Sequence, residues 1–188
     1  MEYCRQGQLY EVIKSGRHIA KDKFAEWARQ IADGMNYLHQ KRIIHRDLKS
    51  PKWAIHFYKF KVDIWSFGVV LWELLTQEVP YKDVDSMAII WGVGSNNLSL
   101  LIPTTAPEGM KLLLRQCWSI KPRNRPSFMH ILTHIAVFKS EIATITDEEW
   151  TAKKARWKAD VIEYMKSIRQ EKPVAQQNKD DSGIFLTH

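Results

Sequence analysis

The residues with the most evident chemistry lie together in the polar segment 40–52, QKRIIHRDLKSPK. This segment holds His45, Arg46, Asp47 and Lys49, whose side chains exchange protons or carry fixed charges. It is too polar and too broken for a helix, which predicts a loop, and loops on a rigid scaffold often carry function. Five fixed letters such as HRDLK arise by chance in on the order of one in ten thousand chains of this length, so the loop predicts a site with exposed chemistry.

Helices are predicted on both sides of this loop. Apolar residues recur at helical spacing from Phe24 to Leu38, and Asp22 is the candidate N-cap. Residues 62–76 are apolar on nearly every face, which predicts a helix in the centre of a domain. Further helices are predicted near residues 8–15 (with Gly16 as the stop), 86–93, 108–118 and 128–138. The predicted fold class is therefore mainly α.

The pattern changes from Asp147 onward. Apolar residues lie seven, four, three and four positions apart, with Lys154 in a core slot; they are Trp150, Trp157, Val161, Tyr164 and Ile168. Two alternatives remain open, a short coiled coil that supports self-association and a helix that packs back on the domain. The predicted organisation is a compact unit over 1–138, an amphipathic helical extension over 139–172 and a flexible tail over 173–188.

The motif HRDLK at 45–49 resembles the catalytic loop of protein kinases. Independent matches follow in the right order, since DIWSFG at 63–68 resembles the start of the kinase core helix and PRNRP at 122–126 the late arginine turn. The opening MEYCRQGQLYEVI resembles a kinase hinge. The resemblance covers about residues 1–138 and implies an incomplete kinase-like C-terminal lobe followed by a C-terminal amphipathic helix.

The longer run from Val62 to Leu100 resembles the dual-leucine-zipper branch of the mixed-lineage MAP kinase kinase kinases. Lys49, two residues after Asp47, fits the serine/threonine pattern. The resemblance implies that Asp47 accepts or orients the proton of the substrate hydroxyl and that Lys49 neutralises the moving phosphoryl group. Outside the motif, each would be an ordinary solvated loop residue.

Other residues have supporting roles by the same resemblance. Arg46 would hold a phosphorylated activation loop, and Asp63 would accept hydrogen bonds from the backbone of the catalytic loop, beside His45. Asp63 is structural on either interpretation. Arg125 in the late turn is architectural rather than catalytic, because in the family it pairs with the glutamate of the APE segment. If Arg125 is buried here, the loss of that partner would cost about 3–5 kcal/mol.

Kinases of this family bind ATP and Mg²⁺, and the hinge candidates for nucleotide contact are Glu2 and Cys4. Lys52 stands where the family has a magnesium-binding asparagine. A protonated lysine cannot coordinate a metal, and near the ion it would oppose binding by several kcal/mol, since unit charges about 4 Å apart interact by about 4 kcal/mol. No metal ligand is therefore assigned.

An internal gap separates this chain from the family. Only 15 residues lie between Asp47 and Asp63, whereas a kinase needs several tens for the DFG metal ligand, the activation loop and the APE segment. WAIHFYKF at 53–60 has no kinase counterpart. Because Met1 already lies at the hinge, the Gly-rich loop and the VAIK lysine are also not seen. We therefore expect this chain not to bind ATP or Mg²⁺.

Composition limits the cellular setting. The 28 Lys and Arg are spread among 21 Asp and Glu, so the net charge of +7 favours a solvated basic surface over a nucleic-acid site. Cys4 and Cys117 match no zinc spacing and form a poor disulfide framework, which favours a reducing, cytoplasmic location. The N-terminal region does not resemble a signal peptide, and the apolar run 62–75 is too short to span a membrane.

Three functional hypotheses follow. The first is a serine/threonine kinase of MAP kinase kinase kinase type, which uses MgATP to phosphorylate a downstream kinase in a MAPK/JNK-type cascade but is inactive as this chain. The second is a non-catalytic, pseudokinase-like module that binds protein substrates or partner kinases. The third is a splice or gene-model fragment without a separate role.

Overall fold

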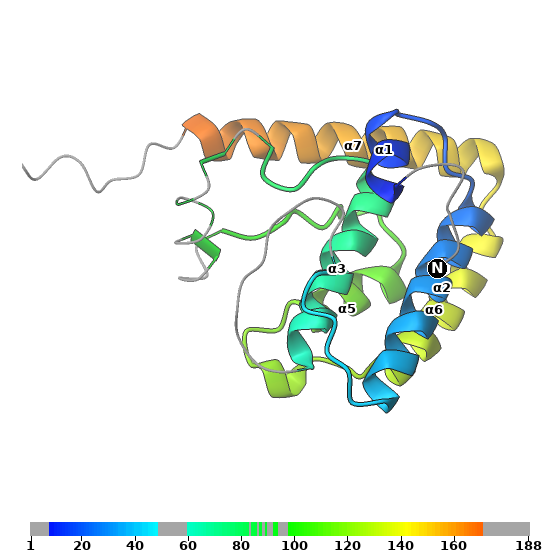
Figure 1. The fold of residues 1–188 in the computed structure, drawn as a ribbon. Helices are drawn as coiled ribbons and strands as arrows, with labels where there is room; N and C mark the ends of the chain where they lie inside the picture. Colours follow the sequence, from blue (N-terminus) through cyan, green and yellow to red (C-terminus); the bar gives the residue numbers. More distant parts are fainter. Residues whose placement is uncertain are drawn as a thin grey trace, which may run out of the picture.

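The computed structural model of the chain describes residues 8–48, 60–82, 84–85, 87, 89, 92–93 and 98–170. These residues form helices and contain no strand (Figure 1). The elements are α1 (Leu9–Lys14), α2 (Lys21–Gln40), α3 (Lys61–Thr76), α5 (Glu108–Cys117), the 3₁₀ helix η1 (Pro122–Asn124), α6 (Phe128–Ala143) and α7 (Asp147–Gln170). The predicted mainly α class is confirmed. The helix predicted near 86–93 lies partly outside the described residues, and the predicted tail lies wholly outside them.

Helix α3 occupies the centre of the molecule, between α2 and α5 (Figure 1). It buries apolar side chains on several faces, including Ile64, Phe67 and Trp72, as its all-round apolar pattern predicts. Gly68 allows close packing against the end of α5, because a Cβ at this position would lie 2.8 Å from the Cβ of Cys117. No helix within the part of the chain that the structure covers is long and apolar enough to cross a membrane.

Helices α2 and α6 pack side by side, with Phe24 and Phe138 rings 5.8 Å apart (Figure 1). The prediction that Asp22 caps α2 is wrong, because the helix begins at Lys21 with Ala20 as N-cap. The Ala20 carbonyl accepts the first helical hydrogen bond, 2.9 Å from the Phe24 nitrogen. Asp22 instead lies in the first turn, where a carboxylate complements the positive end of the helix dipole.

Helix α6 is longer than predicted. It begins after Ser127, whose hydroxyl accepts a hydrogen bond from the His130 backbone at 3.3 Å, and it continues past Phe138 to Ala143. Ile142 is buried four residues after Phe138, so the apolar face of the helix extends by a further turn. A boundary between residues 138 and 139 therefore falls within a helix, and the compact unit continues directly toward α7.

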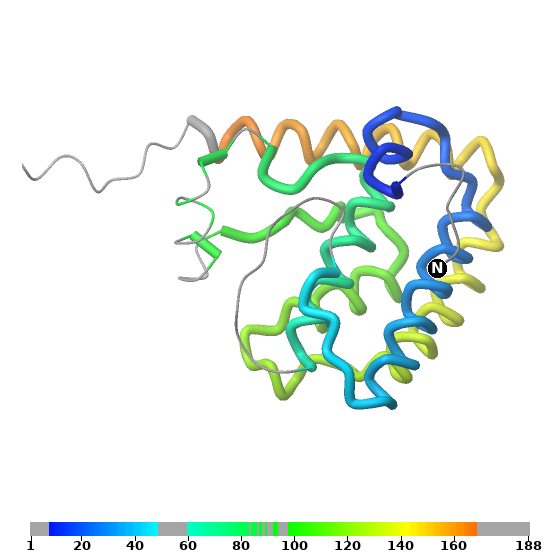
Figure 2. The backbone as a smooth tube through the Cα atoms, in the orientation of Figure 1, coloured from blue at the N-terminus to red at the C-terminus, as the bar shows by residue number. Residues whose placement is uncertain are grey.

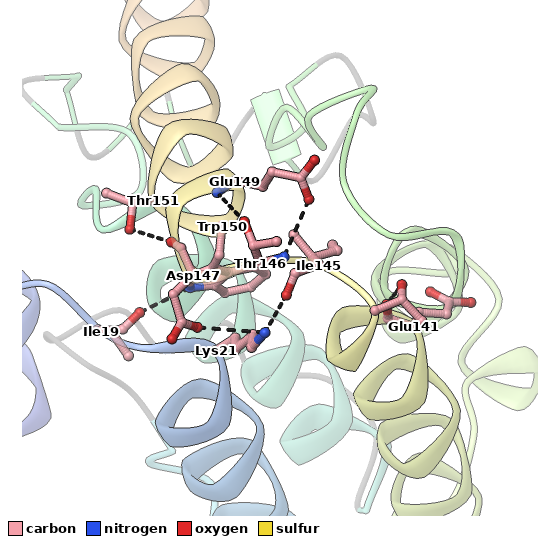
Figure 3. Close-up of polar contacts among 10 residues, drawn as sticks. Ile19, Lys21, Glu141, Ile145, Thr146, Asp147, Glu149, Trp150 and Thr151 are labelled. Atoms are coloured by element: carbon pink, nitrogen blue, oxygen red, sulfur yellow. Dashed lines mark hydrogen bonds and ion pairs between the residues drawn. The ribbon is translucent and has the colours of Figure 1, made fainter.

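A short connection joins α6 to α7, and its polar contacts fix where α7 begins (Figure 3). Thr146 and Glu149 form a reciprocal capping box, with the Glu149 nitrogen 3.2 Å from the Thr146 hydroxyl and the Thr146 nitrogen 3.3 Å from the Glu149 carboxylate. Lys21 of α2 donates to the Ile145 carbonyl and pairs with Asp147 at 3.5 Å. The start of α7 is therefore attached directly to the start of α2.

Helix α7 lies across the domain and packs against α3 (Figure 2). Trp150, Trp157 and Val161 are each 0% exposed, and Lys154 is 6% exposed. Two indole nitrogens donate hydrogen bonds into the domain, from Trp150 to the Ile19 carbonyl at 3.1 Å and from Trp157 to Thr105 at 2.9 Å. Of the two alternatives left open by the spacing, the structure has the packed helix.

Candidate functional site

The candidate catalytic loop begins where α2 ends, and a left-handed residue turns the chain. Arg42 has φ 59°, its nitrogen donates to the His39 carbonyl at 3.0 Å, and the Ile43 nitrogen donates to the Leu38 carbonyl at 2.9 Å. This arrangement satisfies the last carbonyls of the helix, although a non-glycine residue in this conformation costs about 1–2 kcal/mol. The chain is thereby directed toward the first turn of α3.

Asp63, in that first turn, is the anchor of the loop. Its side chain is 0% exposed, and its two oxygens accept hydrogen bonds from the backbone of His45 at 2.9 Å and of Arg46 at 2.8 Å. A buried carboxylate with this many donors is stable because charge-assisted hydrogen bonds replace its lost hydration. The position at the N-terminal end of α3 adds the favourable field of the helix dipole.

His39 completes the anchor and was not found from the sequence. Its Nε2 lies 2.8 Å from the Oδ2 of Asp63, and its ring meets the edges of Phe60 and Phe128 at 5.0 and 4.9 Å between centroids. One signal could have identified it, since His39 follows the buried Met35 by four residues and so shares its helical face. The histidine is held between two rings and one carboxylate, so it has a positioning role.

The backbone at Arg46 directs the next residue outward. Arg46 has φ 61°, a strained conformation that is maintained because the backbone on both sides is hydrogen-bonded. The Asp47 nitrogen donates to the Nδ1 of His45 at 3.3 Å, and Asp47 itself is exposed. The structure thus brings His45, Arg46 and Asp63 together and places Asp47 at the surface beside them.

Comparisons with known proteins assign this arrangement to a family. Residues 1–52 match the description "Protein kinase domain", and residues 52–135 match "Protein tyrosine and serine/threonine kinase". The chain is 44% identical to mitogen-activated protein kinase kinase kinase 12 of Rattus norvegicus and covers 24% of that protein with 91% of its own length. The chain belongs to the protein kinase superfamily.

Other similar kinases give the same result. The human mitogen-activated protein kinase kinase kinase 13 is 44% identical over 91% of this chain and 22% of its own length. The Caenorhabditis elegans kinase dlk-1 is 46% identical over 80% of this chain and 21% of its own length. The chain resembles the C-terminal lobe of these kinases and spans less than a quarter of the relatives' length, so it corresponds to only part of each of them.

The comparisons also bear on the internal gap. The alignment with the rat kinase spans 211 positions, whereas 91% of 188 residues is only about 171, so about 40 positions (211 minus 171) have no counterpart in this chain. The two family matches also meet at residue 52, within the short segment between Asp47 and Asp63. Both observations agree with an interrupted kinase lobe.

Four residues that the kinase resemblance singled out lie outside the described residues. They are the hinge candidates Glu2 and Cys4, the phosphate contact Lys49 and the asparagine replacement Lys52. The segment WAIHFYKF is likewise outside them, except for its last residue, Phe60, which lies directly before α3. The kinase roles of these residues remain predictions.

Arg125 has partners of a different kind from those of the family. Its Nε donates to the Ser119 carbonyl and its Nη1 to the Lys61 carbonyl, each at 2.9 Å, and the guanidinium lies 4.9 Å from the centre of the Trp65 ring. The expected loss of a buried partner is therefore offset by two backbone carbonyls and a cation–π contact. Arg125 ties the first turn of α3 to η1, which is an architectural role.

Cys117, at the end of α5, is a buried free thiol. Burial raises the pKa of Cys117 to about 12, so the thiol stays protonated and unreactive near neutral pH. The charge of Arg125 opposes this rise but is the smaller influence. Cys117 is therefore a packing residue beside Gly68.

Proposed function

We propose that this chain is the C-terminal lobe of a serine/threonine kinase of MAP kinase kinase kinase type in which the internal gap has removed phosphoryl transfer. The similar kinases support a place in the MAPK-cascade family. In a complete protein of this type, the terminal phosphate of ATP passes to a serine or threonine of a downstream kinase. The proposed compartment is the cytoplasm, where such partner kinases would be met.

One contrast supports the proposal. The carboxylate of Asp63 holds the backbone of the catalytic loop at 2.8 and 2.9 Å, yet only 15 residues lie between Asp47 and Asp63. The hydrogen bonds that hold the HRDLK loop to α3 are therefore present, while the sequence between these two residues has no DFG motif. Phosphoryl transfer depends almost entirely on charges held around the nucleotide and its metal, so this gap is decisive.

The side chains that are present do not fit magnesium nucleotide. Lys52, at the position of the asparagine ligand, adds positive charge and cannot coordinate while protonated. In the described ranges, no group of three or more His, Cys, Asp or Glu side chains is placed to hold a metal ion. We therefore expect this chain not to hold MgATP for phosphoryl transfer.

The test is a phosphate-transfer assay with the purified chain, MgATP and a downstream kinase as acceptor. We expect no more transfer than with Asp47→Asn, a nearly isosteric change of an exposed residue that controls for contaminating kinases. Lys52→Asn should stay inactive as well, because the second metal ligand is still missing. Steady turnover that Asp47→Asn abolishes would refute the proposed inactivity.

A second candidate function is that of a non-catalytic module that binds partner kinases or protein substrates. It is favoured by the continuous buried core of α2, α3, α5 and α6, because a folded domain can bind a partner without the catalytic step. Co-purification of the chain with a full-length relative or its downstream kinase would support it. If no kinase is retained, the remaining hypothesis is a fragment without a separate role, which sequencing the transcript across codons 50–62 would test.

A further inference from the structure

A groove of about 490 Å³ lies where the first turn of α3, η1 and the first half of α6 meet. The residues that give it its character are Lys61, Arg123, Arg125, Ser127, His130 and His134. In Figure 1 the first turns of α3 and α6 lie at the bottom of the view, while α7 runs across the top. The groove is therefore separate from the α7 surface.

The groove is strongly cationic. One lysine, two arginines and two histidines line it, and its described lining includes no aspartate or glutamate. No ion pair joins Lys61, Arg123 or Arg125 to a carboxylate among the residues that the structure covers. Elsewhere in the sequence 21 acids are interspersed with the basic residues, so this concentration of one sign of charge is local.

Two of the cations, Lys61 and Arg125, are linked through each other's backbone carbonyls. Lys61 Nζ donates to the Arg125 carbonyl and, at 3.2 Å, to the Pro126 carbonyl, while Arg125 donates back to the Lys61 carbonyl at 2.9 Å. Both residues are half-buried. Burial and the charge of Arg125 lower the pKa of Lys61, which means that the two like charges disfavour one another. An anion in the groove would relieve this repulsion.

The start of α6 adds to the positive electrostatic potential of the groove. Ser127 is the N-cap of this 16-residue helix, and its first turn faces the groove through Ser127 and His130. Backbone N–H groups at a helix start carry partial positive charge, so the helix reinforces the side-chain cations. Arg123 lies at the exposed rim, where it would meet an approaching ligand first.

We propose that this groove binds an acidic peptide segment of a partner protein, with carboxylate side chains facing Lys61, Arg123 and Arg125. A peptide fits better than a nucleic acid, because the positive charge is confined to one groove of a few side chains and does not form a continuous stripe. The interaction needs neither ATP nor an intact catalytic loop. It therefore holds whether or not the chain transfers phosphate.

The experiment is fluorescence anisotropy of a labelled peptide rich in glutamate and aspartate, titrated with the full chain in the absence of nucleotide. A peptide in which Gln and Asn replace the acids is the matched ligand control. We expect Arg123→Glu to weaken binding of the acidic peptide by about tenfold or more, because it reverses one rim charge. Lys166→Glu makes the same charge change at an exposed position on α7 and should leave binding within about twofold.

Three results would overturn the proposal. The first is no binding by the unmodified chain, and the second is equal weakening by Arg123→Glu and Lys166→Glu, which would indicate a general effect of net charge. The third is an oligonucleotide that binds more tightly than the acidic peptide and is itself sensitive to Arg123→Glu. Selective loss with Arg123→Glu, together with no binding of the amide peptide, supports the site.

Discussion

The two ends of α3 hold neighbouring segments in different ways. At its first turn, one buried carboxylate, Asp63, holds the candidate catalytic loop through the backbone of His45 and Arg46 and through His39. At its C-terminal end, two lysine side chains of α7 reach separate backbone carbonyls. Lys154 Nζ lies 3.3 Å from the Leu74 carbonyl and Lys158 Nζ 3.4 Å from the Gln77 carbonyl.

The difference follows the polarity of the helix. The N-terminal end of α3 carries partial positive charge and meets a carboxylate, whereas its C-terminal end exposes carbonyls and meets ammonium groups. The loop attachment is concentrated in one residue, while that of α7 is distributed along the helix and includes Tyr164, whose hydroxyl donates to the Ser99 carbonyl at 3.1 Å. One substitution at Asp63 should therefore release the loop, whereas no single substitution in α7 should release that helix.

The largest effect is expected from Asp63→Ala. This substitution leaves two backbone N–H groups and the His39 ring without their acceptor, so we expect a loss of about 3–5 kcal/mol of unfolding free energy. Urea unfolding followed by circular dichroism measures it. Asp63→Asn, which keeps one acceptor oxygen, should lose less, and Glu163→Gln at an exposed position of α7 should change stability by under about 0.5 kcal/mol. If Asp63→Ala is as stable as the unmodified chain, Asp63 is not the residue that holds the loop in place.

Much of this architecture was predictable because it depends on side-chain pattern. The all-round apolar run predicted α3 within one residue of its start, and the catalytic-loop motif implied the Asp63 contacts. Gly16, with φ +68°, follows α1 as predicted. What could not be predicted depends on backbone groups, which every residue carries. The carbonyl partners of Arg125 and the carbonyl that accepts from Trp150 leave no signal in the sequence.

The apolar residues of α7 show a second limit of what the sequence can predict. Spacings of seven, four and three place Trp150, Trp157 and Val161 on one helical face, but the same face serves a partner helix or the chain's own domain equally well. The choice depends on whether a complementary surface exists nearby. Here Phe24 lies 5.6 Å from the Trp150 ring and Thr105 accepts from Trp157, so the domain supplies that surface.

An intermediate effect is expected from Lys154→Met, which replaces a buried ammonium with an apolar chain of similar length. Burial, followed by the nearby Lys158 charge, lowers the pKa of Lys154 from 10.5 to about 7. The folded state therefore binds this proton more weakly than the unfolded state. The free energy of unfolding should therefore rise as the pH goes from 7 toward 10.5, by about 2 kcal/mol between pH 7 and pH 9. Below pH 7 the destabilisation caused by the buried Lys154 charge should be fully present.

Lys154→Met lacks this titration, so it should be more stable than the unmodified chain at pH 7 and should approach it as the pH rises. Urea unfolding at pH 7 and pH 9 gives the free energy of unfolding of both proteins. In the difference between the two proteins, the contributions of the other groups that titrate in this range cancel. Lys166→Met, at an exposed position of the same helix, is the matched control and should follow the unmodified chain. A pH dependence that is identical in Lys154→Met and the unmodified chain would show that this ammonium is not desolvated.

The smallest effect is expected from Tyr164→Phe, which removes only the hydroxyl that donates to the Ser99 carbonyl at 3.1 Å. A partly exposed hydrogen bond of this kind contributes about 0.5–1 kcal/mol, because water replaces the lost partner. Helix α7 should therefore stay docked, and hydrogen exchange of its backbone amides should remain slow near Trp150 and Trp157. If this one hydroxyl instead releases the whole helix to fast exchange, the attachment of α7 is as concentrated as that of the catalytic loop, and the contrast between the two ends of α3 is wrong.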